Sequence, residues 1–353
     1  MPREWVIDGY NGFESLRLRQ TERERPGPTD VRLKIEAFAL NWGDADLMNN
    51  QYSFSFSSFP ARVGIEAAGI VEAVGEDVEG VDIGERYSTL QYFYDMRGVS
   101  ADTTLIDQAY ITKAPENLSA VEAASVWMQY LTAFYAIVDI AEAAPGVNIL
   151  VPAGTSTAGS AAIRIGKLKG ATIIATTRSE ANRHYLLDKG ADAVFVDDGA
   201  DITSFLREVT AGVGIHTSFD PVGGTFMERY ANAMAPGGKM LMYGLLSGSF
   251  QSPPVVHMYQ NNLWLNAYSV FNHVEDPIAR ARGVDFVYSA LKTGELTADI
   301  DRVFPMDAYI EAWRYLRGER GSYGKVVIET GLLAALAPLF RKQFQGVPTA
   351  NAK

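Results

Sequence analysis

Hydrophobic and polar residues alternate in short runs over residues 1–118, and Gly or Pro separates one run from the next. Alternation with a period of two, bounded by turn residues, predicts half-buried β-strands. No long helical period occurs before residue 119, so we expect an all-β region here. The expected strands are WVID (5–8), VRLKIEAFAL (31–40), AGIVEAVG (68–75) and QAYITKAP (108–115).

The pattern becomes helical over residues 118–141. Ser119 is followed three residues later by Glu122. This is the spacing of a capping box, in which each side chain bonds the backbone amide of the other residue. We therefore expect one long helix over 118–141 that begins at Ser119.

From residue 147 onward, apolar runs of strand length alternate with helical segments that stop at Gly. Strict alternation of strand and helix predicts βαβ units and a parallel sheet. The expected strands are 147–153, 171–178, 191–198, 215–224, 239–244 and 263–270. The expected helices are 159–170, 179–190, 202–212 and 226–238. After this region we expect helices at 276–296 and 305–320 and a final strand at 325–329.

A glycine-rich turn, PAGTSTAGSAA (152–162), joins the first of these strands to its helix. Its spacing matches G-x-G-x-x-G, with Ser replacing the middle Gly. The pattern serves a tight turn, close approach of the backbone to a pyrophosphate and helix amides that face the phosphate oxygens. We therefore predict a dinucleotide site; the alternative is a βα turn without a ligand. The predicted contacts are Gly154, Thr155, Ser156, Thr157, Ala158 and Gly159.

The end of the second strand distinguishes NAD from NADP. A carboxylate there bonds the ribose 2′-hydroxyl of NAD, whereas a cation and small hydroxyls suit the 2′-phosphate of NADP. Arg178 and Ser179 follow the strand directly, Arg183 lies one helical turn further on, and Glu180 is the acid nearby. We therefore predict NADPH, with Arg178, Ser179 and Arg183 at its 2′-phosphate. An exposed helix terminus is the alternative for the two arginines.

Composition narrows the partners and the chemistry. The 353-residue chain has a formal net charge of −11, which argues against nucleic acid or an anionic membrane as the main partner. It contains no cysteine, so disulfides, cysteine zinc sites, iron–sulfur clusters and thiol catalysis are excluded. We see no apolar run of the length that a signal peptide or a membrane span requires. We expect a cytoplasmic protein with a small-molecule substrate.

Together these motifs resemble the medium-chain dehydrogenase/reductase superfamily, most closely its zinc-independent quinone oxidoreductase branch. The resemblance covers about residues 1–330. It rests on ALNWGDADLM (39–48), VGIEAAGIVEAVGEDVEGVDIGER (63–86), ASVWMQYLTAFYAI (124–137), LVPAGTSTAGSAAI (150–163), FDPVGG (219–224) and GKVVIE (324–329). It implies an α/β chain in which a Rossmann doubly wound parallel sheet is inserted in a GroES-like β-barrel domain.

The resemblance also implies domain boundaries and an oligomeric state. The GroES-like domain would comprise 1–123 and 272–330, the Rossmann domain 124–271, and a C-terminal tail 331–353. We expect the amphipathic tail to be a surface helix that covers apolar area. A homodimer is implied through the sheet edge near 263–270, because an apolar edge strand is a liability when exposed.

Zinc-dependent relatives would carry Cys near position 41 and His at position 65, where this chain has Asn41 and Ile65. We therefore expect no metal. Glu66 is expected to be buried and hydrogen-bonded, because a buried carboxylate needs partners. Without a Lewis acid, the hydride acceptor must already be electrophilic, as quinones and enones are. The four histidines have no metal-ligand spacing: His184, His216, His257 and His273.

The resemblance assigns individual residues as well. It places Asn41 and Asp44 near the nicotinamide and Tyr52 on the substrate side; a turn that fixes the β domain is the alternative for Asn41 and Asp44. Relatives often have Lys at position 182 for the 2′-phosphate, so Arg183 is expected to substitute for Asn182 of this chain. Further implied cofactor contacts are Thr132, Gly244, Leu245 and Lys325.

Two aromatic-rich segments, 51–60 and 91–96, are expected to line a pocket for a flat, apolar substrate, with core filling as the alternative. The expected function is NADPH-dependent reduction of quinones or α,β-unsaturated carbonyls by direct hydride transfer. An enoyl-thioester reductase and a non-catalytic NADPH-binding protein are the alternatives.

Overall fold

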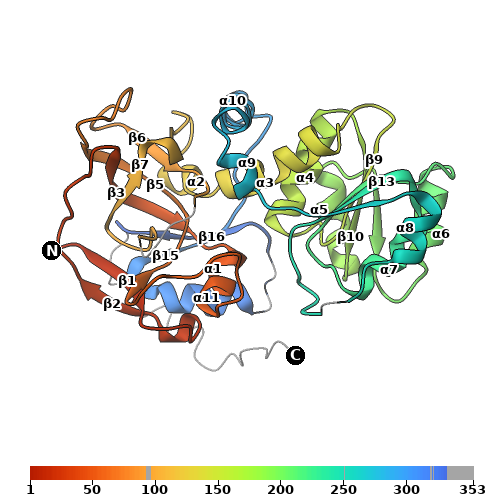
Figure 1. Cartoon of the computed structure of the whole chain (residues 1–353), viewed down its shortest axis with the longest axis horizontal. Coiled ribbons are helices and arrows are strands. Elements are labelled where there is room, and N and C mark those ends of the chain that lie inside the picture. The colour runs from red at the N-terminus through yellow and green to blue at the C-terminus, as the bar shows by residue number, and fades with distance from the viewer. Residues whose placement is uncertain (93–96, 250, 319, 321, 332–353) are drawn as a thin grey trace. The chain divides into compact units, whose positions relative to one another are not determined.

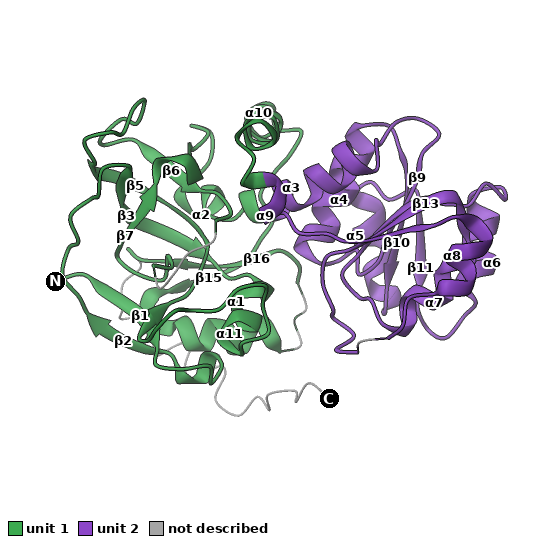
Figure 2. Ribbon diagram, viewed as in Figure 1, with its two compact units in different colours: residues 1–128, 274–351 green, residues 129–273, 352–353 purple. Residues whose placement is uncertain are grey.

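The computed structural model describes residues 1–92, 97–249, 251–318, 320 and 322–331, and the statements below concern these residues. They form two compact units, which we describe separately (Figure 2). Unit 1 comprises residues 1–128 and the described residues from 274 onward, and unit 2 comprises residues 129–273. The expected tail helix lies outside the described residues.

Unit 1 is built on two β-sheets (Figure 1). The larger sheet has the strand order β15 (Ile300–Pro305), β16 (Lys325–Glu329), β3 (Asp30–Ala39), β5 (Glu66–Val74), β6 (Arg86–Thr89) and β8 (Ile111–Lys113), with β7 (Thr103–Asp107) also paired to β3. The smaller sheet has the order β2 (Arg17–Gln20), β1 (Arg3–Ile7) and β4 (Ala61–Arg62). The strands predicted in this part of the chain are thus confirmed as β1, β3 and β5. The strand expected over 108–115 is confirmed only as β8, because residues 108–110 form the 3-10 helix η2 (Gln108–Tyr110).

The register of the larger sheet brings three distant segments together at the end of β3. Ala39 pairs with Glu66 of β5 on one side and with Val327 of β16 on the other. Leu40 continues this pairing, because its amide donates to the carbonyl of Val326 at 3.0 Å. Residues 41, 66 and 325 are therefore neighbours.

The expectation that residues 1–118 are all β is wrong, because helix α1 (Trp42–Met48) follows β3 directly. Its seven residues are too few to show a helical period in the sequence. The expected helix 305–320 is also wrong at its start, since residues up to Pro305 complete β15. Further helical segments of unit 1 are α10 (Pro277–Thr293), α11 (Tyr309–Arg317), η1 (Phe13–Ser15), η2 (Gln108–Tyr110) and η5 (Met306–Ala308).

The long helix expected over 118–141 is broken into three pieces. The capping box of Ser119 and Glu122 is confirmed at the start of α2 (Ala120–Ala123). The Ser125 hydroxyl then donates to the carbonyl of Glu122 at 2.9 Å, a local bond that competes with helix continuation. The chain resumes as α3 (Trp127–Phe134) and ends in the π-helix η3 (Tyr135–Ile140).

Unit 2 is the predicted parallel sheet with alternating helices (Figure 1). Its strand order is β11 (Ala193–Val196), β10 (Thr172–Thr177), β9 (Asn148–Val151), β12 (Ile215–Asp220), β13 (Met234–Met242) and β14 (Trp264–Ala267). The helical segments are α4 (Thr157–Leu168), η4 (Glu180–Asn182), α5 (Arg183–Asp188), α6 (Ile202–Val209), α7 (Thr225–Ala231), α8 (Val255–Asn261) and α9 (Phe271–Val274), the last of which ends in unit 1. The strand order reverses between β9 and β12, which is where doubly wound sheets bind ligands.

The boundary between α7 and β13 differs from the prediction. The helix expected over 226–238 ends at Ala231, and β13 begins at Met234 instead of 239. Met234 pairs with Ile215, and an irregular register follows before Lys239 pairs with Thr217. A bulge therefore carries the Pro-Gly-Gly residues within a strand. Among the helices of the described residues, none is long and apolar enough to cross a membrane.

Candidate functional site

The glycine-rich turn of unit 2 has the close packing that its pattern predicts. The side chain of Ser156, the N-cap of α4, accepts a hydrogen bond from the Gly159 amide at 3.0 Å. A Cβ atom on Gly159 would lie 2.8 Å from the carbonyl oxygen of Ala153, and one on Gly154 would lie 3.0 Å from Leu186. Local packing therefore requires glycine at 159, where the contact is with backbone, and leaves little room for a side chain at 154.

The start of α4 has the features of an anion site. Residues 155–158 are partly exposed, and α4 is twelve residues long. The first amides of a helix have no carbonyl partner within it and carry the positive end of the helix dipole. The buried Ser160 hydroxyl has no hydrogen-bond partner in the described part of the chain, so a further polar atom is available here. These residues fit a dinucleotide pyrophosphate.

The two arginines after β10 are in different situations. Arg183 forms an ion pair with Glu180, with 2.9 Å between Nη2 and Oε2, and it also donates to the carbonyl of Val194 at 2.8 Å. Arg178 is exposed and makes no hydrogen bond or ion pair with the described residues. Ser179 beside it is also exposed. Arg178 is therefore the cation with free donors at this strand end.

The remaining predicted cofactor residues also lie in unit 2, except Lys325. Gly244 and Leu245 follow β13, and the neighbouring Leu246 amide donates to the carbonyl of Pro221 at 2.8 Å, which joins the loops after β12 and β13. Thr132 lies on α3, where its carbonyl accepts from the Tyr268 hydroxyl at 2.8 Å. Carboxyl ends of parallel strands meet at one sheet edge, so the loop with Gly244 shares an edge with the turn after β9.

Sequence reasoning missed Tyr243 at this edge. Its ring stacks on Phe219 with 3.9 Å between ring centroids. Burial raises the pKa of Tyr243, and the hydroxyl of Ser156 in the glycine-rich turn opposes that rise. The Tyr243 hydroxyl has no hydrogen-bond partner of good geometry among the described residues. In the sequence, the only sign that Tyr243 belongs to the site is its position at the end of a strand, next to Gly244.

In unit 1, the predicted residue Asn41 lies in a buried cluster with Glu66 and Lys325. Lys325 Nζ lies 2.7 Å from Glu66 Oε2 and also donates to Asn41 Oδ1. Asn41 Nδ2 donates to Glu66 Oε2 at 3.2 Å, and the Met128 amide donates to Glu66 Oε1 at 2.9 Å. The prediction that Glu66 is buried and hydrogen-bonded is therefore confirmed. That Lys325 is its partner was missed, because the two residues are 259 positions apart.

Asp44 and Tyr52 lie next to this cluster. The Asp44 carboxylate accepts a hydrogen bond from the backbone amide of Asn41 at 3.1 Å, as expected at the start of a helix. Burial raises the pKa of Asp44 to about 7, the Asn41 hydrogen bond and the charge of Lys325 oppose the rise, and the charge of Glu66 adds to it. The pKa of Tyr52 is also raised, chiefly by burial and then by the charge of Asp44. The Tyr52 ring packs against Gly43 in the first turn of α1, so closely that a Cβ atom added to Gly43 would lie 2.8 Å from the ring.

Aromatic side chains of the 51–60 segment pack on one another and on the loop after β1. Tyr10 lies edge-on to Phe59 with 5.1 Å between ring centroids, and its hydroxyl accepts the Phe56 amide at 2.6 Å. Tyr52 and Phe54 form a further edge-on pair at 5.4 Å. The second predicted segment, 91–96, lies outside the described residues from 93 to 96.

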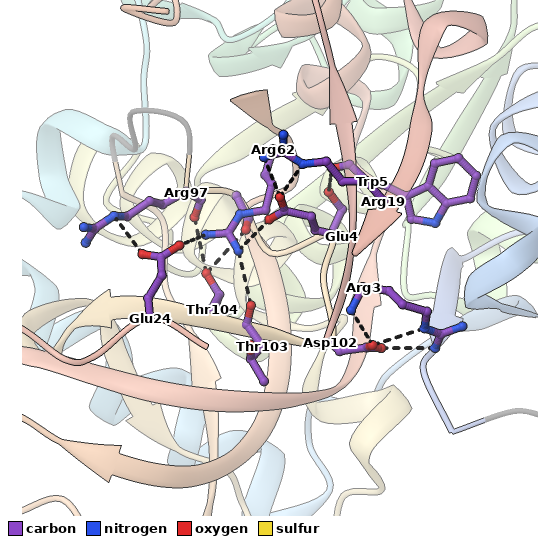
Figure 3. Close-up of polar contacts among 12 residues, drawn as sticks. Arg3, Glu4, Trp5, Arg19, Glu24, Arg62, Arg97, Asp102, Thr103 and Thr104 are labelled. Carbon is purple, nitrogen blue, oxygen red and sulfur yellow. Dashed lines mark hydrogen bonds and ion pairs between the residues drawn. The ribbon is translucent and has the colours of Figure 1, made fainter. Parts of the chain in front are cut away.

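A second group of buried charges in unit 1 surrounds Arg62 (Figure 3). Arg62 Nη1 lies 3.3 Å from Glu4 Oε2, and Arg62 Nη2 lies 3.7 Å from Glu24 Oε1. Arg19 Nη2 lies 2.6 Å from Glu4 Oε1. The cavity beside Arg62 measures about 10 Å³, room for about one water molecule. We interpret this group as structural, because its charges are paired and its cavity is too small for a substrate.

From the sequence, Asn41, Ile65 and the four histidines are predicted not to bind a metal. No three His, Cys, Asp or Glu side chains converge as a possible metal site within the described ranges. Ile65 carries no donor atom, and Asn41 uses its amide on Glu66 and Lys325. His216 illustrates the role of the histidines, because its Nδ1 accepts the Asn148 amide at 2.9 Å.

Two family models match the chain. The alcohol dehydrogenase GroES-like domain matches residues 27–116, and the zinc-binding dehydrogenase model matches residues 158–275. They fall in unit 1 and largely in unit 2, respectively.

Curated relatives cover the chain to different extents. A phenolphthiocerol/phthiocerol polyketide synthase of Mycobacterium tuberculosis is 28% identical over 67% of the chain. The match spans only 11% of that synthase. The 2-haloacrylate reductase of Burkholderia sp. is 25% identical over 92% of this chain and 97% of its own length.

Solved structures share the fold. Quinone oxidoreductase of Escherichia coli, complexed with NADPH, is 21% identical over 93% of this chain and 99% of its own, with a TM-score of 0.83. An NAD-dependent alcohol dehydrogenase is 29% identical over 93% of this chain and 100% of its own, with a TM-score of 0.82. One of these structures holds NADPH and the other is of an NAD-dependent enzyme, so the choice of cofactor depends on this chain's own residues.

Proposed function

We propose that this chain reduces quinones or α,β-unsaturated carbonyls with NADPH and without a metal. The chain belongs to the medium-chain dehydrogenase/reductase superfamily, in its quinone oxidoreductase-like branch, and is an oxidoreductase. The observation that carries the proposal is the cluster of Asn41, Glu66 and Lys325. Asn41 stands near one position where the resemblance puts a metal ligand, and its side chain is engaged with Glu66 and Lys325.

The cofactor half of the proposal rests on unit 2. NADPH, when bound, supplies the hydride. We assign its pyrophosphate to residues 154–159, because Gly154 and Gly159 place no side chain in the turn and α4 presents unbonded amides. Arg178 and Ser179 would hold the 2′-phosphate, since Arg183 is engaged by Glu180. Thr132, Gly244 and Leu245 remain the proposed neighbours of the nicotinamide.

The acceptor half rests on unit 1. A conjugated carbonyl takes negative charge onto its oxygen as hydride adds, and a preoriented hydrogen-bond donor lowers the energy of that state. Asn41 offers an amide donor for this oxygen. Asp44 has a pKa of about 7 and holds a proton near neutral pH, and Tyr52 is a second acid beside it. We propose that these two acids supply the proton that completes the reduction.

The deciding experiment is an NADPH-oxidation screen with the purified chain over quinones, enones and enoyl-CoA thioesters. Turnover of quinones or enones with NADPH is the expected result. Turnover restricted to enoyl-CoA would establish the thioester reductase instead. Stoichiometric NADPH binding without turnover across the whole panel would establish a non-catalytic NADPH-binding protein.

The cofactor assignment has its own test, Arg178→Glu. Reversing the charge at the proposed 2′-phosphate site should weaken NADPH binding at least tenfold and leave NADH binding within about twofold, since a charge-assisted phosphate contact is worth about 1.5–3 kcal/mol. Arg25→Glu is the matched control, because Arg25 is an exposed arginine of unit 1. Unchanged NADPH affinity in Arg178→Glu would remove the basis for preferring NADPH.

We also propose a homodimer formed through β14. This strand is at the end of the sheet in unit 2, and it leaves Trp264 67% exposed. Tyr259 of α8 is 85% exposed, and Val256 beside it is exposed as well. Large apolar side chains next to an open strand edge are typical of a protein interface.

A further inference from the structure

The ion pair between Lys325 and Glu66 is almost fully removed from solvent, with both side chains 2% exposed. Burying two charges costs desolvation energy that their attraction often fails to recover, and apolar replacements are frequently as stable. Stability alone is therefore a weak reason for a buried pair at this position. Its contacts indicate a second role.

The pair fixes the orientation of the Asn41 amide. Lys325 Nζ can only donate, and the Glu66 carboxylate can only accept. Asn41 Oδ1 accepts from Lys325, and Asn41 Nδ2 donates to Glu66 at 3.2 Å. Rotation of the side-chain amide by 180° would place Asn41 Nδ2 against Lys325 Nζ, two donors, and Asn41 Oδ1 against the Glu66 carboxylate, two acceptors. A single orientation is therefore allowed.

This orientation leaves one polarised donor. The Nδ2 atom carries two hydrogens, and Glu66 takes one of them. The described residues offer no acceptor for the second hydrogen, and Asn41 is only partly buried. The ammonium on Oδ1 withdraws electron density from the amide, which strengthens the remaining N–H as a donor.

We propose that Lys325 and Glu66 are positioning residues that hold Asn41 so that its second amide hydrogen donates to the carbonyl oxygen of the acceptor. This inference rests on the proposed function. Hydride adds to the electron-poor carbon of the conjugated system, the π electrons move to oxygen, and the oxyanion accepts the Asn41 hydrogen bond. A proton from Asp44, Tyr52 or water then completes the reduced product, and the cofactor leaves oxidised.

The test is the double variant Glu66→Gln/Lys325→Met. It removes both charges together, so that no unpaired charge is buried, and the Gln oxygen can still accept the Met128 amide. The Gln amide nitrogen would face Asn41 Nδ2, and Asn41 should therefore turn over. We expect kcat to fall by about 100-fold or more, because loss of one oxyanion donor costs ~10²–10³ in rate.

Two further measurements separate positioning from a merely structural role. The affinity for NADPH should stay within about twofold, and the loss in kcat should be larger for enones than for quinones, since quinones delocalise the charge themselves. Lys325→Arg retains a cation and should restore part of kcat. The matched control, Glu4→Gln/Arg62→Met, replaces the other buried pair of unit 1 and should leave kcat unchanged (Figure 3).

A readout without turnover completes the design. In the apo protein, nuclear magnetic resonance of 15N-labelled Asn side chains should show an ordered Asn41 amide in the wild type and a changed or averaged signal in the double variant. Wild-type kcat in a folded double variant, an unchanged Asn41 signal, or a large loss of NADPH affinity would each overturn the inference. Absence of turnover in the wild type would instead refute the proposed function, and the Asn41 signal would still decide whether the pair positions the amide.

Discussion

Replacing Asp44 with Asn tests whether unit 1 holds a protonated carboxyl group near neutral pH. Asp44 is 4% exposed and its carboxyl oxygen accepts the Asn41 amide at 3.1 Å. Burial is the main reason that its pKa rises from 3.8 to about 7. Asn has the same shape and retains an acceptor oxygen, so Asp44→Asn removes the ionisation and little else.

The direction in which pH changes the stability depends on whether the native or the unfolded protein binds the Asp44 proton more tightly. The native protein keeps the Asp44 proton up to about pH 7, whereas the unfolded chain loses it near 3.8. The stability that this proton contributes is fully present below the unfolded pKa and is lost as the pH rises through the native pKa. The shift corresponds to about 4 kcal/mol in total, of which ~2.5 kcal/mol falls between pH 5 and pH 8.

Urea unfolding followed by tryptophan fluorescence measures this effect in unit 1, which contains four of the five tryptophans. Relative to the wild type, Asp44→Asn should gain ~2.5 kcal/mol of unfolding free energy between pH 5 and pH 8. Asp285→Asn, at an exposed position of α10, is the control and should show a difference that does not vary with pH. A difference for Asp44→Asn that changes by less than about 0.5 kcal/mol would show that Asp44 is already ionised at pH 5 in the native state, and would refute the burial argument.

Two further predictions concern unit 2. Gly159→Ala should weaken NADPH binding at least tenfold by isothermal titration, because its Cβ would lie 2.8 Å from the Ala153 carbonyl and would push the turn open; unchanged affinity would show that the turn does not hold the cofactor. Trp264→Glu should convert the proposed dimer to a monomer in analytical ultracentrifugation, whereas Ile278→Glu, at an exposed apolar position of unit 1, should not. A monomeric wild type would refute the dimer, and a dimeric Trp264→Glu variant would place its interface elsewhere.

The sequence predicted those parts of the fold that depend on local patterns. The parallel sheet of unit 2 followed from apolar runs that alternate with helices ending at Gly, and Gly159 of the predicted turn is required by local packing. Helix α1 escaped prediction because its seven residues carry no period, and its start depends on the Asn41–Asp44 bond. The break after α2 coincides with the bond from the Ser125 hydroxyl to the Glu122 carbonyl, and Ser125 has no feature in the sequence that marks the end of a helix.

The candidate site was predicted as a set of residues but not as an arrangement. Asn41, Asp44 and Lys325 could be named from motifs, yet nothing local indicates that Lys325 reaches Glu66, because their proximity depends on both pairing to β3. The difference between Arg178 and Arg183 was missed as well, although Glu180 lies only three residues before Arg183. Both look equivalent after β10, and only the contacts show that Glu180 and the Val194 carbonyl engage one of them.

The charge of the buried cluster argues for the direction of the chemistry. A divalent metal would bring net positive charge, which acidifies a bound alcohol and favours its oxidation. The pair of Lys325 and Glu66 is neutral overall, and the pKa of Asp44 near 7 leaves a proton on a neighbouring carboxyl group. Such a site offers an oriented hydrogen bond and an available proton, but no strong field. These features support the proposed reduction of a conjugated carbonyl, in which the acceptor delocalises its own charge and then takes up a proton.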